Sequence, residues 1–485
     1  MVDLQSTNRV KISKVREATF GVTPASPAFK TRRVTSHGLA TNPQTVISNE
    51  VRSDRQVTDL ILTGYQAGGP SAGEASFNSI DDDIEEAIQG TWTANPNIIV
   101  ATLDTEISDV ATAVITVITA LGSAFKTGML TLLSGFTTAA NNGVFRVLSS
   151  TATSITYTAA SFTAEGAAIP VGATIRVIGF AGVSGDLVAV TAGGNALTST
   201  TLDFTTLGLS AGQWVRINGL ATAADNDFCR ISAITAHRLS FDEVPSGWVA
   251  DAGTSVVVSV YVGDFIINAS TKRSSTFERQ YLDHSPVSYE YHTGQVLDKL
   301  SFTADAGKVL TYTEDWLGAT GSDTTTRVAG ATDTAAPTNA VLNAASSVGR
   351  IGFNGSVVAS PNYVMTAGWN FSNNLRRQMA VSNLGAVGVG NGEFTVTGTL
   401  NMYFGDKTVL DKILNNTLTS FDIRVGRADS NNQSYVFDFP SIKLSSGAPS
   451  VSGKNADVML TASFTAFMSS TLLYTASVTR FWYLP

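Results

Sequence analysis

Residues 393–404, EFTVTGTLNMYF, alternate apolar and polar side chains, and this alternation decides the fold class. The apolar members are Phe394, Val396, Leu400, Met402 and Phe404, and most positions between them carry Glu, Thr, Asn or Tyr. Successive side chains of a strand point to opposite faces, so a period of two predicts a strand with one face in a core. A strand that is buried on one face only is typical of antiparallel sheets.

The surrounding segments extend this prediction to the C-terminal part of the chain. Further strands are expected at 421–427, 433–440 and 457–467. A short helix is expected over 405–417, with Asp406 as its N-cap and an inward face formed by Val409, Leu410, Ile413 and Leu414. The sequence therefore predicts an all-β fold, an antiparallel sandwich or barrel with one or two short flanking helices.

The composition narrows the function classes. The chain has 485 residues and a net charge of −8, which argues against a protein that grips nucleic acid with clustered Lys and Arg. One cysteine and four histidines predict neither a disulfide framework nor a typical zinc site. The longest apolar stretch, 110–125, is too short for a membrane helix and rich in Thr and Val, so we expect buried strand there.

A repeat occupies the middle of the chain. SGFTTAANNGVFRV (134–147) returns 84 residues later as NGLATAADNDFCRI (218–231), and Gly128–Tyr157 matches Gly212–Phe241 at nine of thirty positions. The shared Gly and Asn residues lie where turns need them, and the shared apolar positions lie where strands face a core. Each copy is therefore predicted to be a small β-module.

The repeat divides the chain into four predicted parts. These are a first part of the core (1–100), two modules (101–183 and 184–264), and a second part of the core (265–485). The modules hold 6 Lys and Arg against 12 Asp and Glu, which suggests solvated decorations. The alternative is that they are two ordinary domains in a row.

A short helix is predicted just before the repeat, in SIDDDIEEAIQG (79–90). Ser79 and Asp82 fit a capping box, Ile80, Ile84 and Ile88 fall on one face, and Gly90 can end the helix. The acidic run DDDIEE lacks the spacing of a calcium loop, so we expect a solvated helix face. A loop after such a helix tolerates insertions.

Several segments outside the repeat resemble the tail tube proteins of long, non-contractile-tailed bacteriophages. They are NEVRSDRQVTDLILTGYQAGG (49–69), IDDDIEEAIQGTW (80–92), STFERQYLD (275–283), YEYHTGQVLDKLSF (289–302) and SGKNADVMLTASFTA (452–466). The resemblance covers about 1–100 and 265–485, and the duplicated insert departs from the minimal pattern of the family.

The resemblance implies a function and a set of partners. Tail tube proteins have a β-sandwich or barrel core with a flanking helix and form hexameric rings that stack into a conduit for genome DNA. Some carry extra immunoglobulin-like domains on the outer wall. For this chain the resemblance implies self-assembly, contacts with tail terminator, tape-measure and tail-tip proteins, and DNA that passes without specific binding. It implies a virion location after assembly in the host cytoplasm, and no membrane.

The first sixty residues are expected to form an assembly arm. They show little periodicity and hold 9 basic against 5 acidic residues. Arg52 and Arg55 stand beside Asp54 and Asp59, so these four residues are candidates for ion pairs between subunits. A solvated strand edge is the alternative for them.

No pattern predicts catalysis, a cofactor or a metal. GAPSVSGKN (447–455) has the wrong glycine spacing for a phosphate-binding loop and no Ser or Thr after its lysine. Cys229 and His237 are replaced by Phe145 and Thr153 in the other copy, which argues for a buried small residue and a turn histidine. His284 and His292 have no third ligand nearby in sequence.

Two functions from different classes therefore remain open. The first is the tail tube subunit. The alternative is a tail-tip or fibre adhesin whose modules bind a host surface ligand, which would need exposed aromatic side chains. Trp214 and Trp248 are the only tryptophans in the modules, and Trp214 is expected in a core because it aligns with Leu130. An enzyme comes third.

Overall fold

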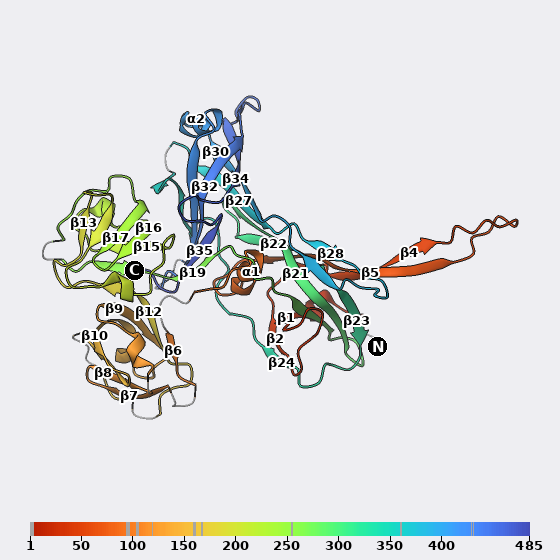
Figure 1. Cartoon of the computed structure of the whole chain (residues 1–485), viewed down its shortest axis with the longest axis horizontal. Coiled ribbons are helices and arrows are strands. Elements are labelled where there is room, and N and C mark those ends of the chain that lie inside the picture. Colours follow the sequence, from red (N-terminus) through yellow and green to blue (C-terminus); the bar gives the residue numbers. More distant parts are fainter. Residues whose placement is uncertain are drawn as a thin grey trace.

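The protein is all-β, as the alternation predicts. The computed structural model describes residues 4–93, 98–102, 106–118, 120–158, 162–165, 168–253, 256–358, 361–427, 429 and 431–485. Its two α-helices are short, α1 (Asp81–Ala87) and α2 (Thr408–Leu414). Figure 1 shows three parts along the longest axis: the repeat region at one end, a central β core, and a long hairpin, β4 and β5, at the other end.

The core is organised around the 18-residue strand β21 (Ser288–Asp305). Its first half pairs with β20 and β23, and its second half pairs with β22 and β27. Gly294 lies where the halves meet, at φ +66°, and a Cβ there would be 2.7 Å from the Ala319 Cβ. Glycine tolerates both the positive φ and the close contact, so it allows one strand to serve two sheets.

The remaining core strands follow from the same pairings. Their bounds are β1 (Val10–Arg16), β2 (Ala28–Thr31), β3 (Ser36–His37), β4 (Ala40–Ile47), β5 (Leu60–Glu74), β19 (Asp264–Ile267), β20 (Ser275–Tyr281), β22 (Thr311–Gly318), β23 (Thr320–Thr324), β24 (Thr332–Thr334), β25 (Val348–Phe353), β26 (Ser356–Val357), β27 (Val364–Ser372), β28 (Arg376–Gln378), β29 (Gly388–Gly390), β30 (Thr395–Tyr403), β31 (Leu418–Gly426), β32 (Ser434–Ser446), β33 (Pro449–Ser450), β34 (Met459–Ala466) and β35 (Ser477–Phe481).

The core sheet curls back on itself. The order β21–β27–β30–β34–β32 is continuous in hydrogen bonds. Nevertheless Phe302 on β21 packs against Phe437 on β32, with ring centroids 5.1 Å apart, and Trp369 on β27 lies equally close to Phe437. The curl therefore encloses an aromatic core in an open sheet, and among the described strands it does not close into a barrel.

The predicted C-terminal elements are confirmed with small shifts. Strand β30 covers the opening stretch, and Val396, Leu400 and Met402 are fully buried. Asp406 accepts a hydrogen bond from the Thr408 amide at 2.8 Å, although α2 itself begins at Thr408. The prediction that Leu414 points inward is wrong, because α2 ends there and the side chain is 71% exposed.

The predicted helix before the repeat is α1, but its capping is different. Ile80, Ile84 and Ile88 are fully buried, as predicted. The Ser79 hydroxyl instead donates to the Ser76 carbonyl at 2.8 Å, so no capping box forms. Gly90 is required by close approach, since a Cβ there would lie 2.2 Å from the Ile267 carbonyl oxygen.

The two copies of the repeat form one continuous antiparallel sheet. Strand β18 pairs with β12 of the first copy and with β15 of the second. The bounds are β6 (Ile98–Val100), β7 (Ile107–Ala111), β8 (Val114–Val117), β9 (Met129–Ser134), β10 (Gly143–Ser150), β11 (Ser154–Tyr157), β12 (Thr174–Ala181), β13 (Val188–Val190), β14 (Ala196–Thr198), β15 (Trp214–Asn218), β16 (Phe228–Thr235), β17 (Arg238–Glu243) and β18 (Ser259–Tyr261). The predicted strand within 110–125 is the hairpin β7–β8, while Thr119 lies outside the described residues.

Equivalent residues of the two copies make equivalent hydrogen bonds. Asn142 accepts from the Phe136 amide at 3.0 Å, and Asn226 accepts from the Leu220 amide at 2.8 Å. Each asparagine amide also donates back to the carbonyl of that same residue. The repeated asparagine thus closes the same turn twice. The division of the chain at 101, 184 and 265 remains our proposal.

The second copy is anchored to the core, so the expectation of solvated decorations is wrong for its inner face. Trp214 and Phe228 of this copy pack with Val436 and Phe481 of the core in one buried cluster. Arg230 forms an ion pair of 3.0 Å with Asp438 on β32, and both side chains are buried. This contact makes the second copy part of the subunit body.

Arg230 and its repeat partner Arg146 provide a matched test of this anchor. Arg146 donates to the Ala181 carbonyl within its own copy and makes no ion pair in the described part of the chain. Arg230→Met leaves Asp438 buried without its cation, and we expect the free energy of unfolding to fall by about 2–3 kcal/mol. Arg146→Met should cost less than about 1 kcal/mol in the same urea titration. Equal losses in the free energy of unfolding from the two substitutions would contradict the role of Arg230 as an anchor.

Glu243 should make this anchor sensitive to pH. Burial raises its pKa to about 7, against the attraction of Arg230, while Ser420 donates to it and Asp438 and Asp242 lie nearby. Because the native state holds this proton more tightly, stability falls as pH rises from the ordinary value of 4.5 to about 7. We expect Glu243→Gln to remove up to about 3 kcal/mol of that fall in thermal or urea unfolding. An unchanged pH profile in the variant would refute this role.

Candidate functional site

The acidic helix α1 is the most highly charged buried element of the core. Asp81, Asp83, Glu85 and Glu86 are all less than a tenth exposed. The prediction of a solvated acidic face is therefore wrong. Buried carboxylates need counter-charges, and these come from strands far away in sequence.

Two cations of the N-terminal segment, Lys14 on β1 and Arg32 just after β2, neutralise the inner side of α1. The Lys14 ammonium lies 2.7 Å from Asp83 and 3.1 Å from Glu86. Arg32 bridges Asp83 at 3.1 Å and Glu314 of β22 at 2.6 Å. Strands β1 and β2 and the residue after β2 are thus held against the core, and the expectation that the first sixty residues form an arm is wrong for residues 10–32.

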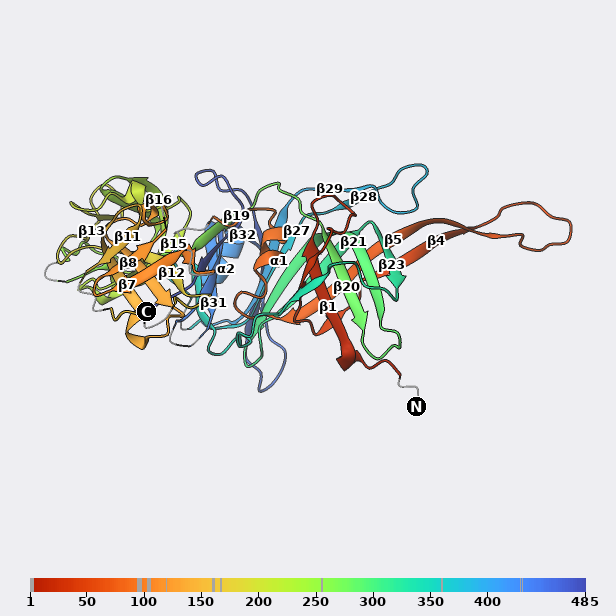
Figure 2. The ribbon, with the colours of Figure 1, turned by 90° about the horizontal axis from the view of Figure 1, so that it is seen from below.

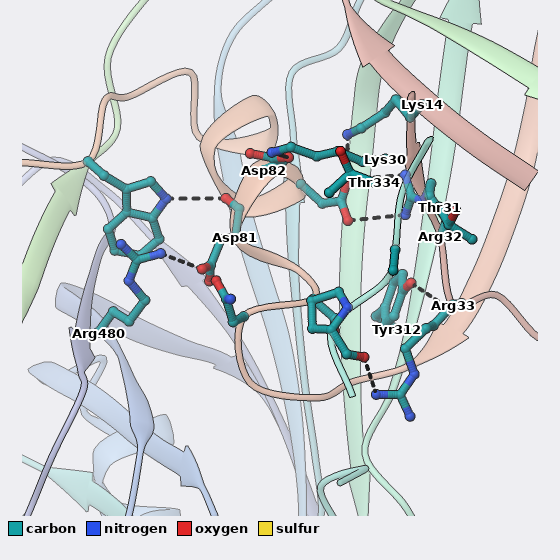
Figure 3. Close-up of a pocket in the computed structure, with 16 residues that line it drawn as sticks. Lys14, Lys30, Thr31, Arg32, Arg33, Asp81, Asp82, Tyr312, Thr334 and Arg480 are labelled. Atoms are coloured by element: carbon teal, nitrogen blue, oxygen red, sulfur yellow. Dashed lines mark hydrogen bonds and ion pairs between the residues drawn. The ribbon is translucent and has the colours of Figure 1, made fainter. Parts of the chain in front are cut away.

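The outer side of α1 is bound by the C-terminal strand. Arg480 on β35 makes ion pairs with Asp81 and with Asp264, and the Tyr435 hydroxyl donates to Asp81. Figure 3 shows Arg480 and Asp81 on one side of a pocket and Arg32, Arg33 and Tyr312 on the other. The helix therefore joins the N-terminal strands, β22 and the C-terminal strand.

The pKa shifts in this cluster follow burial and charge. Burial opposes ionisation of Asp83, but Arg32 and Lys14 outweigh it and hold the pKa of Asp83 below its usual value. Burial raises the pKa of Glu314 to about 7 and raises the pKa of Glu86. The ionisation of each buried carboxylate in this cluster therefore depends on the charges of its neighbours.

A cavity of about 510 Å³ lies beside α1. Its charged lining residues are paired or hydrogen-bonded within the chain: Lys30 with Asp82, and Arg33 with backbone carbonyls of 337 and 339. No group of three metal-ligating side chains occurs among the described residues. The arrangement supports the fold, and its residues are already engaged with one another.

The sequence carried a signal for this cluster. Lys14 and Arg16, and likewise Lys30 and Arg32, stand two residues apart, which is the spacing of one face of a strand. Together they form a cationic surface opposite the DDDIEE run. The two features could not be linked from the sequence, because nothing in the local pattern shows which distant segments meet.

The second candidate site is the projecting hairpin of β4 and β5. It extends well beyond the core in both views (Figures 1 and 2). Near its tip Val46 pairs with Ile61 and Ile47 pairs with Leu60. Directly opposed residues share a face, so the two pairs place exposed apolar side chains on both faces of the ribbon. Strands that are apolar on both faces are normally covered on both faces.

A protein family matches this chain over most of its length. The family model of the phage tail tube protein matches residues 7–466. The chain belongs to the phage tail tube protein family. A comparison with curated proteins found no match. The β-rich core, the flanking helix and the family match agree, so the chain is a structural component of a virion tail.

The four predicted contact residues of this tail tube protein lie at the hairpin tip, between β4 and β5. Arg52 binds Asp54 in a two-pronged ion pair, at 2.9 and 2.6 Å. The Asp59 carboxylate accepts from the Leu60 amide, and within the described residues neither Asp59 nor Arg55 has an ion-pair partner. The structure brings all four to one exposed tip, and their pairing between subunits stays a prediction.

The other sequence candidates have structural roles in this tail tube protein. Cys229 is fully buried, and burial raises the pKa of its thiol. His237 lies in a turn and contacts the Leu202 carbonyl at 3.0 Å. His284 contacts Ser288, and His292 contacts Thr41. The segment 447–455 contains the short strand β33 rather than a phosphate-binding loop followed by a helix.

The tryptophans of the repeat region are both buried. Trp214 is fully inaccessible, and Trp248 donates to the Val190 carbonyl at 3.3 Å. They are unavailable as surface anchors for a ligand. None of the helices in the described ranges is long and apolar enough to cross a membrane.

Proposed function

We propose that six copies of this chain close into a ring, and that the rings stack into the tail tube through which genome DNA is ejected. Ring closure continues the core sheet from one subunit to the next, which removes exposed strand edges. The tube ends at tail terminator and tail-tip proteins and surrounds the tape-measure protein until ejection. Subunits assemble in the host cytoplasm.

The observation that supports this proposal most strongly is the hairpin of β4 and β5. Its tip exposes Val51, Val57, Leu60 and Ile61, with Val51 fully accessible and Val57 68% exposed. A soluble subunit gains nothing from apolar side chains on both faces of a projecting ribbon, which invite association. A neighbouring subunit in the next ring would bury them.

The repeat region lies at the end of the subunit opposite the hairpin tip (Figure 1). We propose that it projects from the outer wall of the tube. Its excess of acidic residues keeps that surface soluble and weakly repels other tails. An adhesin role has no support from the module tryptophans, because both are buried.

Assembly tests the proposal directly. The purified chain should form hollow tubes or six-fold rings at high concentration, with knobs on the outside, in negative-stain electron microscopy. Tail-initiation proteins should raise the yield. Persistent monomers or trimers, even with those proteins added, would contradict the proposal.

A further inference from the structure

The solvent face of five neighbouring core strands, β22, β21, β27, β30 and β34, has an unusual composition. One row across it consists of directly paired residues, in the order Thr313, Ser301, Asn370, Thr397 and Thr465. All of them are short and polar, and none is charged. The core-facing neighbours, such as Phe302, Trp369 and Phe464, are buried.

A second row lies beside the first. Its paired residues are Thr311, Thr303, Gly368, Thr399 and Ser463. We call the two rows together the hydroxyl face. They border a shallow depression of about 430 Å³, in which Gly368 contributes no side chain. The surface is therefore smooth as well as uncharged.

Charged residues appear only around the hydroxyl face. Lys299 stands directly opposite Asp315 beyond the first row, and Asp305 binds Lys308 beyond the second. On β32, the strand next to β34, Lys443 pairs with Thr465. The chain has 31 Lys and Arg residues, and none lies in either row.

This composition fits neither an ordinary surface nor a protein-docking surface. Solvent-exposed faces of soluble proteins are rich in charged side chains of both signs. Docking surfaces expose apolar or aromatic side chains at their centre. A wide sheet face with hydroxyl groups alone offers no strong attraction to a protein or to an anion.

We propose that the hydroxyl face lines the conduit and that its occupant is duplex DNA in transit. Lysine or arginine at these positions would hold phosphates and release counter-ions, which would retain the DNA. Hydroxyl and amide groups make only weak contacts through exchangeable water. The inference rests on the proposed tube and names which surface of the subunit faces its lumen.

Cysteine labelling of assembled tubes tests this assignment. Thr399→Cys places a thiol on the hydroxyl face, and Thr235→Cys places one at another exposed strand position, in the second repeat copy, while the native Cys229 is buried. The two probes are N-ethylmaleimide and a maleimide coupled to serum albumin, which is too bulky to enter the tube. Both variants should react with both probes as free subunits.

In long tubes we expect Thr399→Cys to react with N-ethylmaleimide but at least tenfold less with the albumin probe, whereas Thr235→Cys reacts with both. Albumin labelling of Thr399→Cys in tubes would place the face outside, and loss of both reactions would place it between subunits; either result overturns the inference. Ser463→Cys is the second variant of the same row. Failure of the unaltered chain to assemble would instead refute the tube proposal.

Discussion

Replacing Leu60 and Ile61 together by aspartate is expected to abolish tube assembly and leave the subunit folded. The two side chains lie on opposite faces of the β4–β5 ribbon, because Leu60 pairs with Ile47 and Ile61 with Val46. They are 61% and 48% exposed in the subunit, so the free energy of unfolding should change by less than about 0.5 kcal/mol. In the tube, burying the two new charges would cost several kcal/mol for each contact.

The control for this variant uses two exposed apolar residues of the repeat region. Val171 and Leu148 are 70% and 49% exposed, and they lie at the other end of the subunit. Val171→Asp with Leu148→Asp should assemble normally. Sedimentation and electron microscopy report assembly, and circular dichroism reports the fold. Normal tubes from the Leu60 and Ile61 variant would show that the hairpin tip is not a subunit contact.

Arg32→Met should lower the free energy of unfolding by about 3–5 kcal/mol, because it strands two carboxylates in the core. Arg32 bridges Asp83 on α1 and Glu314 on β22, and the side chains of all three residues are 7% exposed or less. The remaining partner of Asp83 is Lys14, while Glu314 keeps only a hydrogen bond from the Trp316 indole. Urea unfolding of the purified subunit measures the loss.

Lys30→Met is the matched control, two residues earlier in the same segment. Lys30 pairs with Asp82 at 2.7 Å, but its side chain is 61% exposed. Exposed ion pairs contribute at most about 1 kcal/mol to stability, so the free energy of unfolding of this variant should be close to that of the unaltered protein. Similar, small effects of both substitutions would mean that the cluster around α1 does not hold the core together.

Periodicity predicted the parts of this fold that depend on local pattern. The alternation in 393–404 identified β30, and the isoleucine spacing identified the buried face of α1. The repeat likewise predicted that Asn142 and Asn226 occupy equivalent turns. These features need only the period of a strand or helix and the chemistry of a turn.

Features that depend on distant contacts could not be predicted in this way. Arg146 and Arg230 are equivalent in sequence, yet only Arg230 of the two meets a carboxylate of the core: it lies beside Asp438 on β32, whereas Arg146 donates to the Ala181 carbonyl of its own copy. The acidic face of α1 can be buried because Lys14 and Arg32 neutralise it. These cations come from segments that no local sequence pattern connects to the helix. The four residues of the hairpin tip were found by their charge, whereas the apolar pairs beside them were overlooked.

Helical reconstruction of assembled tubes by electron cryo-microscopy would locate the hairpin and the repeat region of every subunit. We expect six subunits in each ring, hairpin residues 46–61 packed on both faces against the next ring, and the repeat region on the outer wall. A tube in which these residues remain exposed to solvent would contradict the account, as would a repeat region that faces the lumen.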